Sequence, residues 1–268
     1  IEGAYNSDGR GASIWDTFTG ADTVGMVGSN CSAAPCPINA AMFAKGATGN
    51  VANDHYHRMK DDVASMKAMG LKHYRFSISW PRVVPTGRIA DGVNAKALSF
   101  YSSLVDELLA AGITPAVTMY HWDLPQALLA PQRGAHGWYG TVGNSSLGTP
   151  DGSAPVVAAF TEYADVLFRS LGDRVKMWLT FNEAWTFTWL ASGAGKAPCL
   201  SEYADMQRWP LVAGHNVLLA HAEVVQLYRE KYQASQGGQI GITNNCDWRE
   251  PLSPAPENVG AAERATQW

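Results

Sequence analysis

The sequence has no long apolar run and no surplus of basic residues. Its 20 Lys and Arg residues are outnumbered by 24 Asp and Glu residues, which gives a net charge of −4 over 268 residues. This balance gives no support to a nucleic-acid partner or to an acidic membrane surface. No segment approaches the roughly 18 consecutive apolar residues that cross a bilayer, so no membrane span is expected. Apolar residues still make up 46% of the chain, which predicts a large globular core.

Cysteine is scarce, with four residues in the chain. Cys31 and Cys36 are near enough in sequence for a disulfide that closes a short loop, whereas Cys199 and Cys246 have no obvious local partner. All three pairings of four cysteines therefore stay open. The doubled Cys-x-x-Cys spacing of zinc sites is absent, so neither a metal nor another cofactor is expected.

Two Asn-x-Ser sequons, at Asn30 and Asn144, fall in loop-like sequence. Such sites are glycosylated in the secretory pathway, so they favour a secreted or endomembrane protein. Asn144 lies within the segment 131–155, which is rich in Gly, Pro and Ser. That composition predicts a long surface loop, either near the entrance of the functional site or as a passive spacer.

Apolar segments rich in β-branched and aromatic residues alternate along the chain with helical patterns. Buried strands are predicted at 1–4, 71–80, 113–122, 175–182 and 238–245. Helices are predicted at 54–70, 94–112, 155–174, 210–232 and from 257 onwards. A helix between consecutive strands acts as a crossover connection, so the strands are expected to form a parallel sheet.

Two parallel architectures accommodate this order of elements. A doubly wound nucleotide-binding sheet would carry a Gly-rich phosphate loop after its first strand, and none follows the segment 1–4. A (β/α)₈ barrel fits better, and a complete one takes about 250 residues. The connections here are long, so the chain provides about five of the eight βα units. We therefore expect a single catalytic-type α/β domain over 1–268, a partial (β/α)₈ TIM barrel truncated at both ends.

Polar and aromatic residues gather where the predicted strands end, which is where (β/α)₈ barrels hold their chemistry. They include Arg75, Trp80, His121, Trp122, Asp123, Asn182, Glu183 and Asn244. Hydrogen-bond donors, a carboxylate and flat aromatic rings suit a polyhydroxylated sugar ring as ligand. Lysine is absent from the set, which argues against a phosphate ligand and against a Schiff-base aldolase.

Five segments resemble, in the right order, the signature blocks of glycoside hydrolase family one, the retaining enzymes of the β-glucosidase type. They read EGA with DGRGASIWDTF, then YRFSISWPRVVPTG, YHWDLPQAL, DRVKMWLTFNEAW and GHNVLLAHAEVVQLYR. The resemblance extends over essentially the whole chain. It implies a (β/α)₈ barrel, a small-molecule glycoside or oligosaccharide substrate, and hydrolysis of β-glycosidic bonds by a double displacement that retains configuration.

The resemblance also implies roles for the strand-end residues. Glu183 corresponds to the general acid/base, which gives a proton to the departing glycosidic oxygen. Asn182 corresponds to the residue that hydrogen-bonds the sugar 2-hydroxyl, and His121 and Trp122 correspond to positions that hold other sugar hydroxyls. Arg75 corresponds to the arginine that keeps the nucleophilic carboxylate ionised and oriented.

Other matching positions are expected to support the site or the fold. Asn244 is expected to support the site residues without touching the substrate, and Glu2 and Asp16 are expected to be structural. Ala184 stands where the family usually has proline after the acid/base. Proline would stiffen that turn, so Ala184 is expected to loosen the geometry without abolishing proton transfer.

The second carboxylate of a retaining glycosidase is missing from the sequence. Retention requires a nucleophile about 5–5.5 Å from the acid/base, and the family takes it from a Thr-Glu-Asn-Gly-like block that this chain lacks. The family's first-strand Gln would also lie just before Ile1. Two interpretations follow. The chain is part of an enzyme completed by a carboxyl-terminal half or by another chain, or it is a truncated, non-catalytic sugar-binding or structural fragment.

Overall fold

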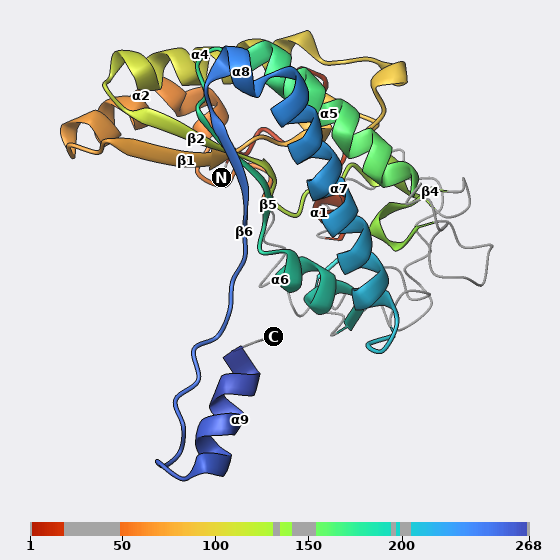
Figure 1. Cartoon of the computed structure of the whole chain (residues 1–268). Helices are drawn as coiled ribbons and strands as arrows, with labels where there is room; N and C mark the ends of the chain where they lie inside the picture. The colour runs from red at the N-terminus through yellow and green to blue at the C-terminus, as the bar shows by residue number, and fades with distance from the viewer. Residues whose placement is uncertain are drawn as a thin grey trace.

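The computed structural model describes residues 2–18, 49–130, 135–140, 154–193, 197–198 and 205–266. A parallel sheet of four strands, in the order β1, β2, β5, β6, lies at its centre (Figure 1). The strands are β1 His73–Ser77, β2 Thr114–Tyr120, β5 Met177–Asn182 and β6 Gln239–Thr243. Each lies within a segment that the sequence predicts to be a strand, so these four predictions are confirmed.

Neighbouring strands pair in parallel, so their carboxyl ends meet at one edge of the sheet. Tyr120 at the end of β2 pairs with Phe181 on β5. Asn182, the last residue of β5, pairs with Thr243 of β6 after an irregularity in the register. The residues that follow β2, β5 and β6 therefore emerge side by side, as the sequence predicts for a functional site.

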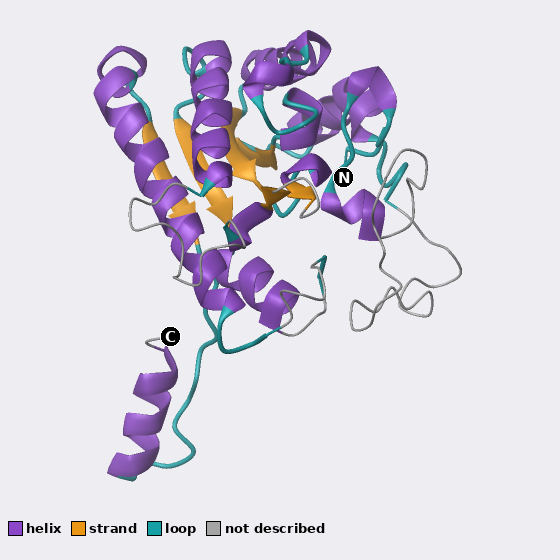
Figure 2. Ribbon diagram, turned by 90° about the vertical axis from the view of Figure 1, so that its right-hand side faces the viewer, coloured by secondary structure: helices purple, strands orange, loops and turns teal. Residues whose placement is uncertain are grey.

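Four long helices are α2 His55–Ala68, α4 Ala95–Ala110, α5 Pro155–Leu171 and α7 Trp209–Lys231. The helices α4, α5 and α7 are crossover connections between consecutive strands, whereas α2 precedes β1. Helices pack along the sheet (Figure 2). The start of α4 is set by Asn94, whose side chain accepts a hydrogen bond from Lys96 N at 3.1 Å. Proline lies in the first turn of α5 and of α7, where its missing N–H costs no helical hydrogen bond.

Aromatic side chains fill the core between the sheet and α5. The rings of Trp80 and Tyr163 stack with centroids 5.2 Å apart, and those of Phe160 and Phe181 stack at 4.5 Å. All four side chains are fully buried. Buried aromatic rings contribute large apolar areas to stability, so Trp80 serves the core although it follows a strand end.

The strand predicted at 1–4 is wrong for the described residues of that segment. Gly3 and Ala4 have φ angles of +65° and +48°, which lie outside the extended region of a strand. Within the described residues the parallel sheet therefore has four strands rather than the five predicted, and it does not close into a barrel.

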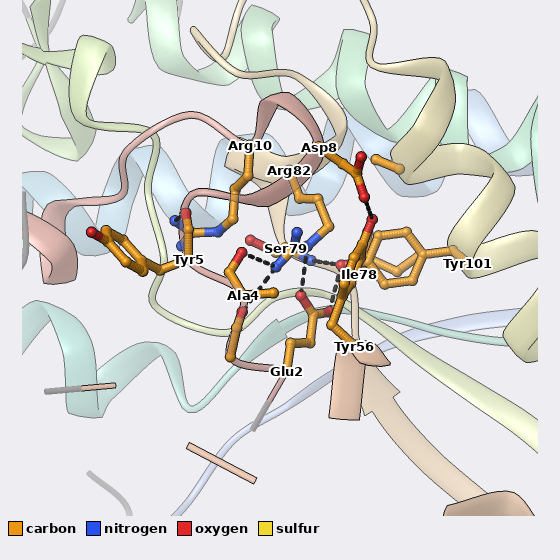
Figure 3. Close-up of polar contacts among 12 residues, drawn as sticks. Glu2, Ala4, Tyr5, Asp8, Arg10, Tyr56, Ile78, Ser79, Arg82 and Tyr101 are labelled. Carbon is orange, nitrogen blue, oxygen red and sulfur yellow. Dashed lines mark hydrogen bonds and ion pairs between the residues drawn. The ribbon is translucent and has the colours of Figure 1, made fainter. Parts of the chain in front are cut away.

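An ion pair anchors Glu2, the residue that precedes Gly3 and Ala4. Arg82 Nε donates to Glu2 Oε2 at 2.9 Å, and the Tyr101 hydroxyl donates to the other carboxylate oxygen (Figure 3). Arg82 also donates to the Gly3 carbonyl at 3.1 Å, and its guanidinium lies 4.3 Å from the centre of the Tyr56 ring. Arg82 is only 1% exposed, so the Glu2 carboxylate compensates a positive charge that is shielded from water.

The helix predicted from 257 onwards is α9, Pro256–Thr266, which stands apart from the sheet (Figures 1 and 2). It follows the irregular segment 244–255 and buries none of its residues. Among the helices that the structure describes, none combines the length and the apolar character needed to cross a membrane.

Replacing Glu2 by Gln is expected to lower the free energy of unfolding by about 3 kcal/mol, because Arg82 would keep a buried charge without its carboxylate. The exposed pair of Lys60 and Glu107, joined at 3.3 Å, supplies the control. Lys60→Gln is expected to change the same free energy by less than about 0.5 kcal/mol. Urea unfolding measures both values, and equally small effects would contradict the structural role of Glu2.

Candidate active site

Hydrogen bonds join three of the predicted site residues, Arg75, Trp122 and Asn182. Arg75 Nε donates to Thr118 Oγ1 on β2 at 2.9 Å, and Arg75 Nη2 donates to Asn182 Oδ1. Trp122 Nε1 donates to the main-chain carbonyl of Asn182 at 2.8 Å. Because the Asn182 side-chain oxygen is taken by the arginine, its Nδ2 amino group is the donor that remains for a ligand.

Glu183 turns the chain from β5 into the short helix α6, Ala184–Thr188. Its φ angle is +51°, a left-handed conformation that is uncommon for residues other than glycine. Its N–H donates to the Thr243 carbonyl on β6 at 2.7 Å, and its Oε2 accepts from Thr186 Oγ1 at 3.2 Å. The backbone of Glu183 is thus anchored to the neighbouring strand, while the side chain is only partly buried.

The imidazole of His121 lies within the electric field of both Arg75 and Glu183. Partial loss of hydration lowers the pKa of His121 and the Arg75 cation lowers it further, while the Glu183 carboxylate acts in the opposite direction. A lowered pKa leaves the ring neutral at pH 7, with one nitrogen as donor and the other as acceptor. This state suits sugar hydroxyls, which also donate and accept hydrogen bonds.

Asp123 is a titratable group to which the sequence assigns no role, although it lies at the same strand end. Burial raises the pKa of Asp123 to about 7, opposed by the Ser79 hydroxyl and by the Arg10 cation. Its Oδ1 is buried and has no hydrogen-bond partner among the described residues. The sequence contained one sign that Asp123 could belong to the site: its carboxylate comes directly after a predicted buried strand that ends in His121 and Trp122.

A cavity of about 500 Å³ lies against the carboxyl ends of β1 and β2. Arg75, Thr118, His121 and Asp123 contribute to its wall. Its volume is that of a small-molecule site, and its polar lining can hydrogen-bond a hydroxylated ligand. In the part of the chain that the structure describes, no three His, Cys, Asp or Glu side chains are grouped as metal ligands.

The remaining predicted residues are not brought into this set of contacts. Asn244 follows β6 directly and is exposed, so its supporting role stays a prediction. Cys246 is exposed and its thiol is free. Five further residues of the sequence-based predictions lie outside the described residues: Asn30, Cys31, Cys36, Asn144 and Cys199.

Residues 1–268, the whole chain, match the family model of glycosyl hydrolase family 1. The chain belongs to this family. Beta-glucosidase 24 from Oryza sativa subsp. japonica is 42% identical to it over 275 residues, which cover 98% of this chain and 48% of that protein. Furostanol glycoside 26-O-beta-glucosidase from Hellenia speciosa is 40% identical over 272 residues, which cover 99% of this chain and 42% of that protein.

The fold of the chain matches half of a solved structure of family 1. The β-glucosidase from the fungus Humicola insolens, in complex with glucose, matches with a TM-score of 0.81 and 37% identity, covering 100% of this chain and 50% of that one. This similarity confirms that the sheet is part of a family 1 TIM barrel. The chain spans about half the length of the curated relatives it matches.

The raised pKa of Asp123 predicts a pH-dependent contribution to stability. The folded carboxyl keeps its proton up to about pH 7, whereas the unfolded one releases it near 3.8. The contribution therefore falls as the pH rises between these values and is lost above about pH 7.

Asp123→Asn removes this titration. Between about pH 5 and about pH 8, the free energy of unfolding of the wild type is expected to fall relative to that of the variant. Urea denaturation of both proteins at the two pH values measures this change. A difference between wild type and variant that is the same at both values would contradict the raised pKa.

Proposed function

We propose that the protein hydrolyses β-glycosidic bonds with retention of configuration, by the double displacement of the β-glucosidase type. The observation that carries the proposal is the pair Asn182 and Glu183 at the end of β5, with Arg75 bonded to the amide and the imidazole of His121 nearby. Membership of family 1 supports it. The nucleophile is assigned to residues beyond this chain, in the same polypeptide or in another one.

In this mechanism Glu183 is the general acid/base. It protonates the departing oxygen and later takes a proton from the water that hydrolyses the glycosyl-enzyme intermediate. The Thr186 hydroxyl donates to Oε2 of Glu183 at 3.2 Å, which leaves Oε1 to carry the proton. The left-handed turn at Glu183 sets the direction in which this carboxyl leaves the sheet.

The neighbouring residues bind and orient the sugar. Asn182 offers its Nδ2 amino group to the 2-hydroxyl, since its Oδ1 already accepts from Arg75. Neutral His121 exchanges hydrogen bonds with a further hydroxyl. Trp122 gives its indole N–H to the Asn182 carbonyl, so it contributes its ring rather than its N–H to the substrate. Arg75 keeps charge and hydrogen-bonding capacity for the nucleophilic carboxylate.

The substrate that we propose is a small β-glucoside. Two relatives are named as β-glucosidases, one of them for a furostanol glycoside, and a solved relative holds glucose. The cavity beside Arg75 and His121 has polar side chains in its wall that can hydrogen-bond a hexose, although Asn182 and Glu183 do not line it. These relatives share the glucosyl group rather than one leaving group, so the proposal specifies the glycone and not the aglycone.

A second candidate is a non-catalytic sugar-binding or structural fragment. It is favoured by the placement of the later glutamates that the structure describes. Glu223 and Glu230 are exposed on α7, Glu250 is exposed in the irregular segment after β6, and Glu257 and Glu263 lie on α9. None of these positions is at the carboxyl edge of the sheet, where a nucleophile would have to face Glu183.

The mass of the protein isolated from its natural source separates the two candidates. A mass of 28.9 kDa, that of the chain alone, would support the fragment. A mass near twice that value, with β-glucosidase activity, would support the enzyme. A stable complex with a second polypeptide of similar size and the same activity would support it as well.

In the active protein, Glu183→Gln is expected to lower kcat/KM for alkyl β-glucosides about 10²- to 10⁴-fold, because their leaving groups need the proton. Dinitrophenyl β-glucoside needs little protonation, so its kcat/KM is expected to change far less. Glu230→Gln, at an exposed carboxyl on α7, is the matched control and is expected to leave both values unchanged. Equal losses on the two substrates would contradict the acid role of Glu183.

A further inference from the structure

The amino-terminal helix α1, Ile14–Phe18, is attached to the loop that follows β2. Ile14 N–H donates to the Leu124 carbonyl at 2.9 Å, and Gln126 N–H donates to the Ala12 carbonyl at 2.8 Å. These bonds join two segments that are far apart in the sequence. The roles proposed above make no use of α1, although it lies in one of the blocks by which the sequence resembles its family.

The position of α1 is fixed by a buried carboxylate. Asp16 Oδ2 accepts from Ser13 N–H at 2.7 Å and from Arg10 Nη1 at 2.7 Å. Asp16 is 9% exposed, so these charge-assisted bonds are shielded from water. A helix of five residues would not be stable alone, and this cluster gives it a defined place beside the loop.

Two indole N–H groups connect α1 to the peptide group of the proposed acid/base. Trp15 Nε1 donates to the Trp122 carbonyl at 3.1 Å, and Trp122 Nε1 donates to the Asn182 carbonyl at 2.8 Å. The Asn182 carbonyl and the Glu183 N–H belong to the same peptide group. That N–H donates to the Thr243 carbonyl at 2.7 Å, so the peptide plane is held from both sides.

Two residues linked by these hydrogen bonds have left-handed backbone conformations. The φ angle of Trp122 is +78° and that of Glu183 is +51°. Such conformations cost free energy in a bulky residue and persist only where surrounding contacts impose them. The hydrogen bond from Trp15 acts on the carbonyl of Trp122 itself, and therefore opposes relaxation of this residue toward an ordinary conformation.

We propose that Trp15 is a positioning residue for the acid/base. Its indole N–H holds Trp122 in the left-handed conformation, and this directs the Trp122 indole N–H onto the Asn182 carbonyl. The peptide group before Glu183 then keeps one orientation, and with it the carboxyl that delivers the proton. The catalytic consequence rests on the proposed function, whereas the structural link does not.

The structural link is tested on the full 268-residue chain. Trp15→Phe keeps an aromatic ring on α1 and removes the N–H donor. Hydrogen exchange of the Trp122 indole N–H, followed by NMR in protein with ¹⁵N-labelled tryptophan, is expected to become about tenfold faster. Benzothienylalanine at position 15, which keeps the bicyclic shape and replaces N–H by sulfur, is expected to give the same acceleration if the phenylalanine variant folds poorly.

Thr17→Val is the matched control, because it removes another hydrogen bond between α1 and the same loop. Thr17 Oγ1 donates to Gln126 Oε1 at 2.7 Å, a hydrogen bond in which Trp122 takes no part. The exchange rate of the Trp122 indole N–H is expected to change less than about twofold in this variant. An unchanged rate in Trp15→Phe, or an equal acceleration in Thr17→Val, would overturn the proposal.

The catalytic consequence is tested in the active protein. Trp15→Phe is expected to lower kcat/KM about tenfold for alkyl β-glucosides and less than about twofold for dinitrophenyl β-glucoside, since a misaligned acid harms only leaving groups that need the proton. Equal losses on both substrates would overturn the positioning role. A wild type that cleaves neither substrate, combined with the expected exchange rates, would refute the proposed function and leave the link from Trp15 to Trp122 supported.

Discussion

The reach of Arg75 from β1 across β2 to β5 is the interaction on which the site depends. Its guanidinium donates to Thr118 and to the side-chain oxygen of Asn182. Partial loss of hydration lowers the pKa of His121, and the charge of Arg75 lowers it further. The guanidinium of an arginine is planar and always charged, so it can donate to two acceptors in a fixed geometry, which a lysine ammonium cannot do. One side chain therefore orients the Asn182 amide and also favours the neutral form of the His121 imidazole.

Local patterns were sufficient to predict the four strands of the parallel sheet and the helices α2, α4, α5, α7 and α9, because periodicity and caps such as Asn94 act within a few residues. Short elements such as α1 and α6 were not predicted. The gathering of Arg75, His121 and Asn182 followed from the parallel order of the strands. The strand predicted at 1–4 was wrong for a physical reason. A strand needs a neighbour to pair with, and here the segment is held instead by an ion pair between Glu2 and the distant Arg82, which no local pattern contains.

Other parts of the site depend on contacts that no local pattern contains. The left-handed conformations of Trp122 and Glu183 are unusual for their residue types, so sequence preference points away from them. The raised pKa of Asp123 depends on burial by segments distant in the sequence. In the sequence Trp15 cannot be distinguished from other apolar residues. Only the structure shows that its indole N–H donates to the Trp122 carbonyl.

The open sheet has a consequence for how the chain behaves in solution. Within the described residues, β1 and β6 each pair along one side, so the peptide groups along both outer borders of the sheet have no strand partner. Exposed edge strands pair with strands of other molecules and so promote self-association unless another polypeptide covers them. A closed cylinder is the arrangement that removes them. Under the proposed function, the polypeptide that completes the cylinder therefore protects these borders from aggregation and also supplies the nucleophile.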